Sequence, residues 1–280
     1  MNIISTPSTG SSCGACKDGS AEPFAFTMAF QPIVDISDQT VFAYEALVRG
    51  PAGESAYSVL SQVTEESRYA FDQNCRVKAI TLASRLRAHE HGARLSVNFM
   101  PGAVYSPSAC IQRTLRAARE TGFPLQSLIF EITEDERVRD TAHLQDIVSE
   151  YRSHGFTLAL DDFGAGYSGL DLLAELNVDV LKLDMRLVRH IHTSLRSTAI
   201  VRAVVAMCHE LNVRVIAEGV ETVDEFELLR DLGIVLMQGY LFARPMLEGL
   251  PAINWPVENR ATFQPAPVAE ASLESLFTRM

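Results

Sequence analysis

Polar side chains that can bind metal ions or carry protons stand at the ends of several short apolar segments of the chain. Acidic side chains in such positions cost free energy unless they are paired or bound to metal. Oxygen ligands of this kind favour Mg²⁺ or Mn²⁺ over zinc. The residues concerned are Glu45, Arg49, Asn98, Glu131, Glu134, Asp161, Asp162, Lys182, Asp184, Glu218, Glu221 and Gln238. If the fold brings the segment ends together, the sequence predicts a divalent-metal site.

The adjacent residues Asp161 and Asp162, together with Lys182, indicate the reaction of such a site. Consecutive strand residues face opposite ways, so both carboxylates reach one site only where the strand ends and bends. Two ions about 4 Å apart, bridged by one carboxylate, would stabilise both oxygens of a phosphoryl displacement. Lys182 stands in the apolar run 180–183, where it could hold the attacking water or neutralise transition-state charge. The prediction is cleavage of a phosphodiester, although paired carboxylates alone would also allow a sugar hydrolase.

Eight apolar runs have the length of buried strands, and helix-period segments separate most of them. They cover residues 26–34, 41–48, 94–99, 127–132, 157–161, 178–183, 213–217 and 235–239. This alternation is typical of a TIM barrel, whose active sites lie at the carboxyl ends of the strands. The link 35–40 is too short for a crossover helix, so the first two strands should pair antiparallel. The predicted fold is α/β: a single-domain, modified TIM (β/α)8 barrel with an antiparallel first strand.

Two helices are predicted from their own signals. Residues 200–211 carry apolar side chains at steps of three and four, namely Ile200, Val204, Met207, Cys208 and Leu211. Thr222 and Glu225 form a capping box that opens a second helix. Its inward-facing residues are expected to be Phe226, Leu229 and Leu232.

Composition excludes several classes of protein. The 280 residues are 47% hydrophobic and 21% charged, as in ordinary globular proteins, and the formal net charge is −11. This charge argues against DNA or an anionic membrane surface as a partner, so phosphate would need a local cation such as a bound metal. No apolar run reaches the roughly 18 residues of a membrane span. The scattered Cys75, Cys110 and Cys208 fit core positions, and a cytoplasmic location is expected.

Three regions are expected along the chain. Residues 1–23 are rich in Ser, Gly and Thr and predict a disordered leader. Its Cys13 and Cys16 form one CxxC, which is either half of a zinc site, a redox pair or incidental. Residues 24–255 form the predicted barrel. Residues 256–280 form a Pro-rich tail with a possible short helix at 271–277.

A set of motifs in fixed order resembles the EAL-domain cyclic di-GMP phosphodiesterases. The resemblance covers roughly residues 25–250 and begins with Gln31 in the first strand and Glu45-Ala46-Leu47 in the second. The later motifs are Glu131-Ile132-Thr133-Glu134, Asp161-Asp162-Phe163-Gly164, Leu181-Lys182-Leu183-Asp184, Ala217-Glu218-Gly219-Val220-Glu221 and Gln238-Gly239-Tyr240. Two departures, Phe99-Met100-Pro101 after Asn98 and Gly-Ala-Gly at 164–166, remove no predicted ligand.

The resemblance implies hydrolysis of cyclic di-GMP to linear pGpG with two Mg²⁺ or Mn²⁺ ions. It implies Glu45, Asn98, Glu131, Asp161, Asp162 and Glu218 as metal ligands. It places Lys182, Glu218, Gln238 and Glu134 in the catalytic machinery. Lys182 is implied as the general base or the group that positions the water, and Glu134 as the brace of the loop after the fifth strand. Implied substrate contacts are Gln31, Arg49, Asp184 and Pro245, with Arg49 suited to a phosphate.

Alternatives to turnover remain open at this stage. The chain could be a receptor that holds cyclic di-GMP without cutting it, or an interaction protein that signals through a loop and a dimer face. The loop 162–168 contains two glycines and is expected to couple the aspartate pair to a partner. A homodimer is implied by the resemblance, and regulatory partners in trans are conceivable.

Overall fold

The computed structural model describes residues 24–90, 92–133, 141–166 and 169–256. The predicted leader and tail, including Cys13, Cys16 and the helix at 271–277, lie outside these residues, as does Glu134. Eight strands correspond to the eight predicted runs, within a few residues at each end. They are β1 (Thr27–Asp35), β2 (Thr40–Arg49), β3 (Arg94–Asn98), β4 (Leu128–Thr133), β5 (Thr157–Phe163), β6 (Val180–Leu183), β7 (Arg214–Ala217) and β8 (Leu236–Met237).

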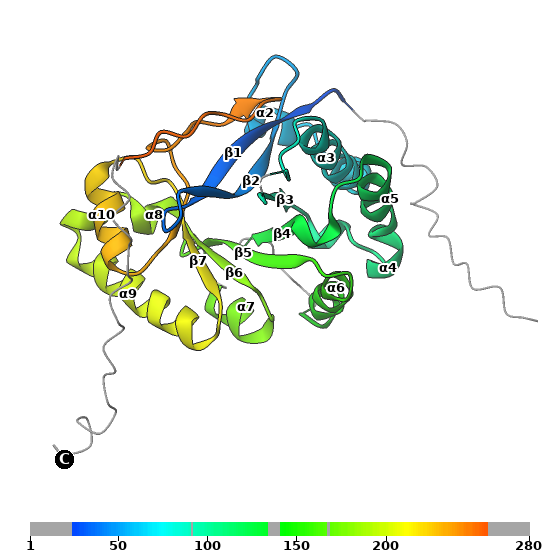
Figure 1. The fold of residues 1–280 in the computed structure, drawn as a ribbon. Helices are drawn as coiled ribbons and strands as arrows, with labels where there is room; N and C mark the ends of the chain where they lie inside the picture. The colour runs from blue at the N-terminus through cyan, green and yellow to red at the C-terminus, as the bar shows by residue number, and fades with distance from the viewer. Residues whose placement is uncertain (1–23, 91, 134–140, 167–168, 257–280) are drawn as a thin grey trace, which may run out of the picture.

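The strands close into a barrel (Figure 1). Strands β2 to β8 are parallel neighbours in chain order, and β1 lies antiparallel between β8 and β2. The antiparallel pairing of β1 and β2 was predicted from their short link and is confirmed. A ninth strand, β9 (Met246–Leu247), pairs with the start of β1 and was not predicted. A strand of only two residues is too short to show an alternating or a continuous apolar pattern in the sequence.

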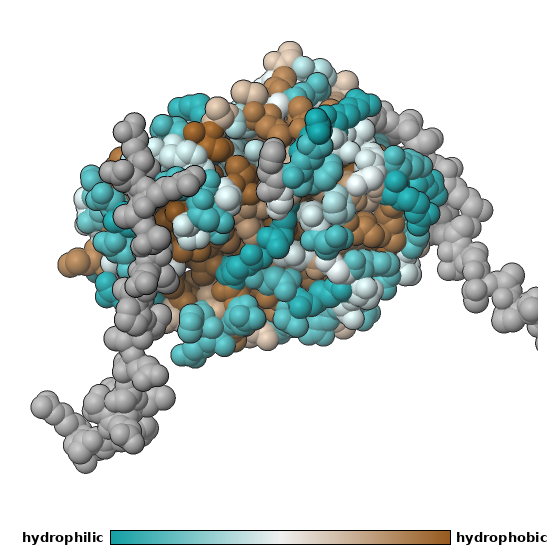
Figure 2. Space-filling model, viewed as in Figure 1, coloured by the Kyte–Doolittle hydropathy of each residue, from teal (hydrophilic) through white to brown (hydrophobic). Residues whose placement is uncertain are grey.

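Helices surround the barrel (Figure 1). The longest are α3, α6 and α9, and a short α2 lies between β2 and α3. The helical elements are α2 (Ala56–Leu60), α3 (Glu65–Arg85), η1 (Pro101–Ala103), α4 (Pro107–Cys110), α5 (Gln112–Thr121), η2 (Leu125–Ser127), α6 (Thr141–Ser153), α7 (Gly169–Glu175), α8 (Met185–Val188), η3 (Ile191–Thr193), α9 (Leu195–Glu210) and α10 (Val223–Asp231). In Figure 2, hydrophilic residues lie mainly around the rim of the face shown, and apolar residues show between them nearer its centre.

The two helix predictions have different outcomes. The capping box of Thr222 and Glu225 opens α10, and Phe226 and Leu229 are buried, as expected. Helix α9 also forms, but its buried residues are Val201, Val204 and Cys208. Ile200 and Leu211 are about half exposed, so the expected inward face was wrong at both ends. Leu211 already lies past the last turn, where the chain leaves the helix axis.

The inside of the barrel is filled by a separate apolar layer. Seven of its members, one from each of seven strands, have exposed fractions of 2% or less: Ile33, Ala43, Ile129, Ala159, Val180, Ile216 and Leu236. The larger core fills the space between the strands and the helices. Cys110 and Cys208 are buried in it, and Cys75 is half-buried. Among the described residues, no helix is both long and apolar enough to cross a membrane.

Candidate metal centre

A polar layer lies directly above the apolar layer of the barrel interior. Side chains on one face of a strand recur every second residue. In six of the parallel strands, the residue two positions after the apolar-layer residue therefore also points into the barrel. It lies nearer the carboxyl end of the strand. These residues are Glu45, Glu131, Asp161, Lys182, Glu218 and Gln238. Gln31 comes two residues before Ile33, because β1 runs the other way.

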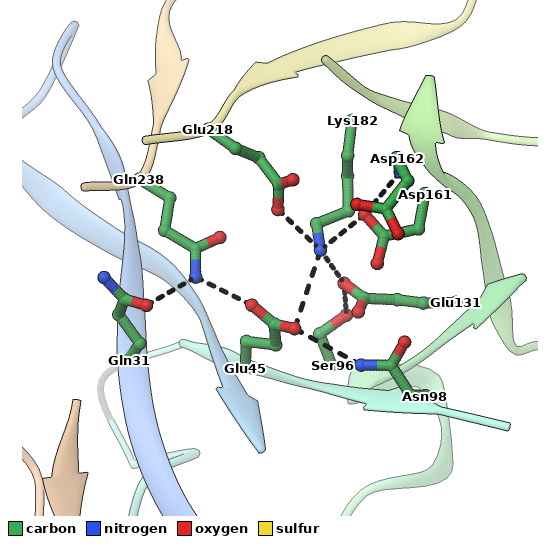
Figure 3. Close-up of polar contacts among 10 residues, drawn as sticks. All are labelled: Gln31, Glu45, Ser96, Asn98, Glu131, Asp161, Asp162, Lys182, Glu218 and Gln238. Atoms are coloured by element: carbon green, nitrogen blue, oxygen red, sulfur yellow. Dashed lines mark hydrogen bonds and ion pairs between the residues drawn. The ribbon is translucent and has the colours of Figure 1, made fainter. Parts of the chain in front are cut away.

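Lys182 occupies the centre of this polar layer (Figure 3). Its Nζ lies 2.8 Å from Glu218, 2.9 Å from Glu131, 3.0 Å from Asp161 and 3.7 Å from Glu45. The lysine side chain is 1% exposed. One positive charge therefore faces four acidic side chains, which come from β2, β4, β5 and the residue that follows β7.

Neutral side chains orient the carboxylates from below and from the side. Ser96 donates a hydrogen bond of 2.6 Å to Glu131. The Nε2 of Gln238 donates to Glu45 at 2.7 Å and to Gln31 at 3.2 Å. Nδ2 of Asn98 donates to Glu45 at 3.2 Å, which leaves the Oδ1 of Asn98 available as a ligand (Figure 3).

The end of β5 shows how consecutive aspartates reach one site. Asp162 has a left-handed backbone (φ 56°), and the pairing of β5 with β6 shifts between Leu160 and Phe163. The N–H of Asp162 donates to the carboxylate of Asp161 at 2.9 Å. The left-handed conformation is unusual for a non-glycine residue, although Asp tolerates it better than most. This bend replaces the strand alternation that would have sent the two side chains to opposite faces.

Burial governs the protonation of the site. Desolvation raises the pKa of Glu131 to about 8, with Glu45 and Asp161 adding to the rise and Lys182 opposing it. Desolvation likewise raises the pKa of Asp161 and, more strongly, that of Glu218. Burial alone would lower the pKa of Lys182, but Asp161, Glu131, Glu218 and Glu45 outweigh burial and raise it well above its usual value. Without metal, the site therefore holds a charged lysine among acidic groups that keep their protons to a higher pH than usual.

This donor set fits divalent metal ions. Ligand oxygens of Glu45, Glu131 and Asp161 lie within 4.8 Å of one another, as do those of Asp161, Asp162 and Glu218. The buried Oε2 of Glu131 has no hydrogen-bond partner. All donors are oxygens, which matches Mg²⁺ and Mn²⁺. Asp161 belongs to both groups.

A cavity of about 370 Å³ opens above the polar layer. Predicted residues line it, including Gln31, Glu45, Asp184 and Gln238. Arg189, Glu221 and Tyr240 also border it, and Arg189 forms an ion pair with Glu221. A pocket with acidic walls and one arginine needs bound cations before it can accept a phosphate.

Two predicted substrate residues are not among those that line this cavity. The guanidinium of Arg49 donates to the backbone carbonyl of Val48 at 2.7 Å. Pro245 is half-buried in the segment before β9. Glu134 lies outside the described residues. Sequence reasoning missed Ser96, although its position two residues before Asn98 on a strand marks it as a side chain of the same face.

Comparison with known proteins identifies a family. Residues 22–245 match the model of the EAL domain. The chain is 29% identical over 228 residues to the blue light- and temperature-regulated antirepressor BluF of Escherichia coli, covering 81% of this chain and 56% of BluF. It is 30% identical over 228 residues to the cyclic di-GMP phosphodiesterase PA2567 of Pseudomonas aeruginosa, covering 79% of this chain and 38% of PA2567. The chain thus spans roughly half or less of the length of these relatives.

Solved structures give the same result. A standalone versatile EAL protein from Vibrio cholerae, in its c-di-GMP-bound form, is 50% identical with a TM-score of 0.80. That match covers 84% of this chain and 98% of the Vibrio protein. Klebsiella pneumoniae BlrP1, in a manganese and cyclic di-GMP complex, is 37% identical with a TM-score of 0.79, covering 85% of this chain and 60% of BlrP1.

Proposed function

This chain belongs to the EAL-domain family, and we propose that it is a metal-dependent phosphodiesterase that hydrolyses cyclic di-GMP to linear pGpG. One observation carries the proposal: acidic side chains of β2, β4 and β5, and Glu218 directly after β7, converge with Asn98 and form two overlapping groups of oxygen ligands. Relatives named as cyclic di-GMP phosphodiesterases, and solved relatives with this ligand bound, support the choice of substrate.

The ligands we assign to two Mg²⁺ or Mn²⁺ ions are Glu45, Asn98, Glu131, Asp161, Asp162 and Glu218. Bound ions would activate water and neutralise charge on the phosphoryl oxygens. Asp161 would serve both ions, because its oxygens lie in both ligand groups. The surplus of carboxylates over Lys182 explains why cations should enter this site in a protein that otherwise repels phosphate.

Lys182 is assigned to orient the attacking water and to balance negative charge in the transition state. Its raised pKa keeps the ammonium protonated in the metal-free site, which favours hydrogen-bond donation over the role of general base. Gln238 holds Glu45 and Gln31 in place through its amide. A product with a 5′-phosphate requires that water attack phosphorus while the bond from phosphorus to the 3′ oxygen breaks.

Substrate contacts are assigned to Gln31, Asp184, Arg49 and Pro245. Gln31 and Asp184 already border the cavity above the ligands. Arg49 ends the strand that carries Glu45, so a change of its side-chain rotamer would bring a planar, charged group toward a bound phosphate. Glu134 is assigned, from the family motif alone, to bracing the loop after β5.

A metal-dependent assay with cyclic di-GMP tests the function. The wild-type chain should release pGpG with Mg²⁺ or Mn²⁺ and none with EDTA, and Glu45→Ala should abolish release. Glu65→Gln, which changes an exposed glutamate on α3, is the matched control and should keep full activity. Tight binding of cyclic di-GMP that stays intact for hours in either metal would instead identify a receptor.

The assembly state also belongs to this proposal. We assign a homodimer that communicates with the site through the loop after β5, and regulatory partners acting in trans. Part of that loop, residues 167–168, lies outside the described residues.

A further inference from the structure

A buried polar network outside the barrel ties helix α3 to the loop that follows β3. Asp72 and Arg76 lie four residues apart on α3 and form an ion pair whose side chains are 1% and 0% exposed. Arg76 also donates to the hydroxyl of Tyr151 on α6 at 2.9 Å. The other carboxylate oxygen of Asp72 accepts the backbone N–H of Met100 at 2.9 Å. The network therefore joins two helices to the residue two positions after Asn98.

Close to Asn98, the loop after β3 packs against the core on one side and borders a cavity on the other. The ring of Phe99 packs against Tyr151, with ring centroids 5.3 Å apart, and the N–H of Phe99 donates to the carbonyl of Glu131 at 3.3 Å. On the other side, a cavity of about 570 Å³ between β2, α2 and α3 borders Asp72, Asn98 and Met100. A cavity provides no packing contacts, so the hydrogen bond to Asp72 restrains the loop there.

Stability alone does not account for a charged pair at this depth. Replacing a buried ion pair by apolar residues of similar size is often neutral or stabilising, because the desolvation penalty disappears. Asp72 has a second effect besides pairing with Arg76. It is a fixed acceptor for the Met100 N–H, and this bond determines the direction of the chain at the end of β3. We propose that the Asp72–Arg76–Tyr151 network positions Asn98 and thereby sets the affinity of the site for divalent metal ions. The proposal rests on one part of the proposed function, the assignment of Asn98 as a metal ligand, and not on turnover.

Two double variants of the full chain separate the acceptor from the charges. Asp72→Leu/Arg76→Met removes both charges and the acceptor for Met100. Asp72→Asn/Arg76→Gln also removes both charges, but the asparagine oxygen can still accept the Met100 N–H and its amide can donate to the glutamine. Phe156→Leu is the matched control, because Phe156 is a buried ring beside Tyr151 (centroids 6.0 Å apart) and donates no hydrogen bond to the network.

The measurement is Mn²⁺ affinity, read from the electron paramagnetic resonance signal of free Mn²⁺ without cyclic di-GMP. The Leu/Met variant should bind Mn²⁺ about 10–100-fold more weakly, as expected when a group that orients a ligand is lost. The Asn/Gln variant and Phe156→Leu should bind close to the wild-type value. Hydrogen exchange of the Met100 amide in metal-free protein should accelerate only in the Leu/Met variant.

Wild-type Mn²⁺ affinity in a folded Leu/Met variant would overturn the proposal. An equal loss in the Asn/Gln variant or in Phe156→Leu would overturn it as well. Asp72→Ala/Arg76→Met removes the same acceptor with less bulk, so the test does not depend on leucine fitting. Because no substrate is present, the outcome is independent of turnover: weakened Mn²⁺ binding in a chain that cuts nothing would refute the proposed function and leave this inference standing.

Discussion

At the scale of single residues, Lys182 is the one cation within 3.7 Å of the carboxylates of Glu45, Glu131, Asp161 and Glu218 among the residues that the structure describes. Its ammonium offsets part of the negative charge of these four groups when no metal is bound. Lysine and metal would therefore both offset the negative charge of three buried acids, Glu45, Glu131 and Asp161, and of the half-buried Glu218.

Lys182→Met should destabilise the metal-free protein by roughly 3–5 kcal/mol, because it leaves buried carboxylates without their partner. Added Mn²⁺ should recover part of this loss by supplying the missing charge. Urea unfolding in EDTA and in Mn²⁺ measures both effects. Equal unfolding midpoints for variant and wild type in EDTA would contradict this account of the charge balance.

The pH dependence of stability follows from the raised pKa of Glu131, about 8 when folded against about 4.5 for an ordinary glutamate. Between these values the folded state binds more protons than the unfolded state, so stability falls as pH rises. The metal-free protein should therefore unfold at a lower temperature at pH 8 than at pH 6. Thermal scans in EDTA check the sign, and a rise in stability over this interval would refute it. Saturating Mn²⁺ should reduce the difference in unfolding temperature between pH 6 and pH 8, because bound metal takes the place of the protons on the acidic side chains.

Much of the site was predictable residue by residue, because inward positions on neighbouring strands follow the two-residue period. Glu131 and Lys182 could be placed on one face of the barrel from their strands alone. The left-handed bend at Asp162 could only be inferred as a requirement, since no residue type demands it. The central position of Lys182 was beyond reach, because a sequence does not give distances between strands.

At the scale of elements, the loops after β7 and β8 meet at Gly239. The N–H of Val220 donates to the carbonyl of Gln238 at 3.0 Å, and the N–H of Leu241 donates to the carbonyl of Val220 at 3.0 Å. A Cβ at Gly239 would stand 2.0 Å from the Val220 carbonyl oxygen, a contact with backbone that no rotamer relieves. The two loops that carry Glu218 and Gln238 can approach each other only with glycine here.

Gly239→Ala should therefore separate these loops, lower stability by on the order of 1–3 kcal/mol, as overpacking does, and weaken Mn²⁺ binding. Gly102→Ala is the matched control, because a Cβ there meets only the end of the Arg68 side chain, at 3.9 Å. Denaturant unfolding and Mn²⁺ titration of both variants give the comparison. Similar behaviour of the two alanine variants would show that close approach at Gly239 is unimportant.

The helices and strands that hydrophobic periodicity can reveal were predicted from the sequence. Eight strands and the antiparallel start followed from run lengths and one short link. The inward face of α9 was predicted less well, because its apolar residues spread around the helix and only packing selects Val201, Val204 and Cys208. The short β9 depends on pairing with β1, a partner more than 200 residues away in sequence.

At the scale of the whole molecule, we expect a homodimer that uses the first residues of α7 and α9. Leu170 on α7 is 63% exposed and Leu195 on α9 is 90% exposed, and each stands near the start of its helix. Leu195→Asp should shift the protein toward monomer in light scattering. Leu211→Asp, at the far end of α9, should leave the dimer intact. A wild-type chain that stays monomeric at high concentration would contradict the expectation.

The apolar layer beneath the polar layer has a consequence for how this protein can change over generations. The floor of Ile33, Ala43, Ile129 and their neighbours fills the barrel without help from the acids above it. Mutations that remove the acidic side chains therefore need not unfold the barrel. A descendant could lose Glu45 or Asp161, keep its barrel, and persist as a receptor that binds the proposed substrate without cutting it.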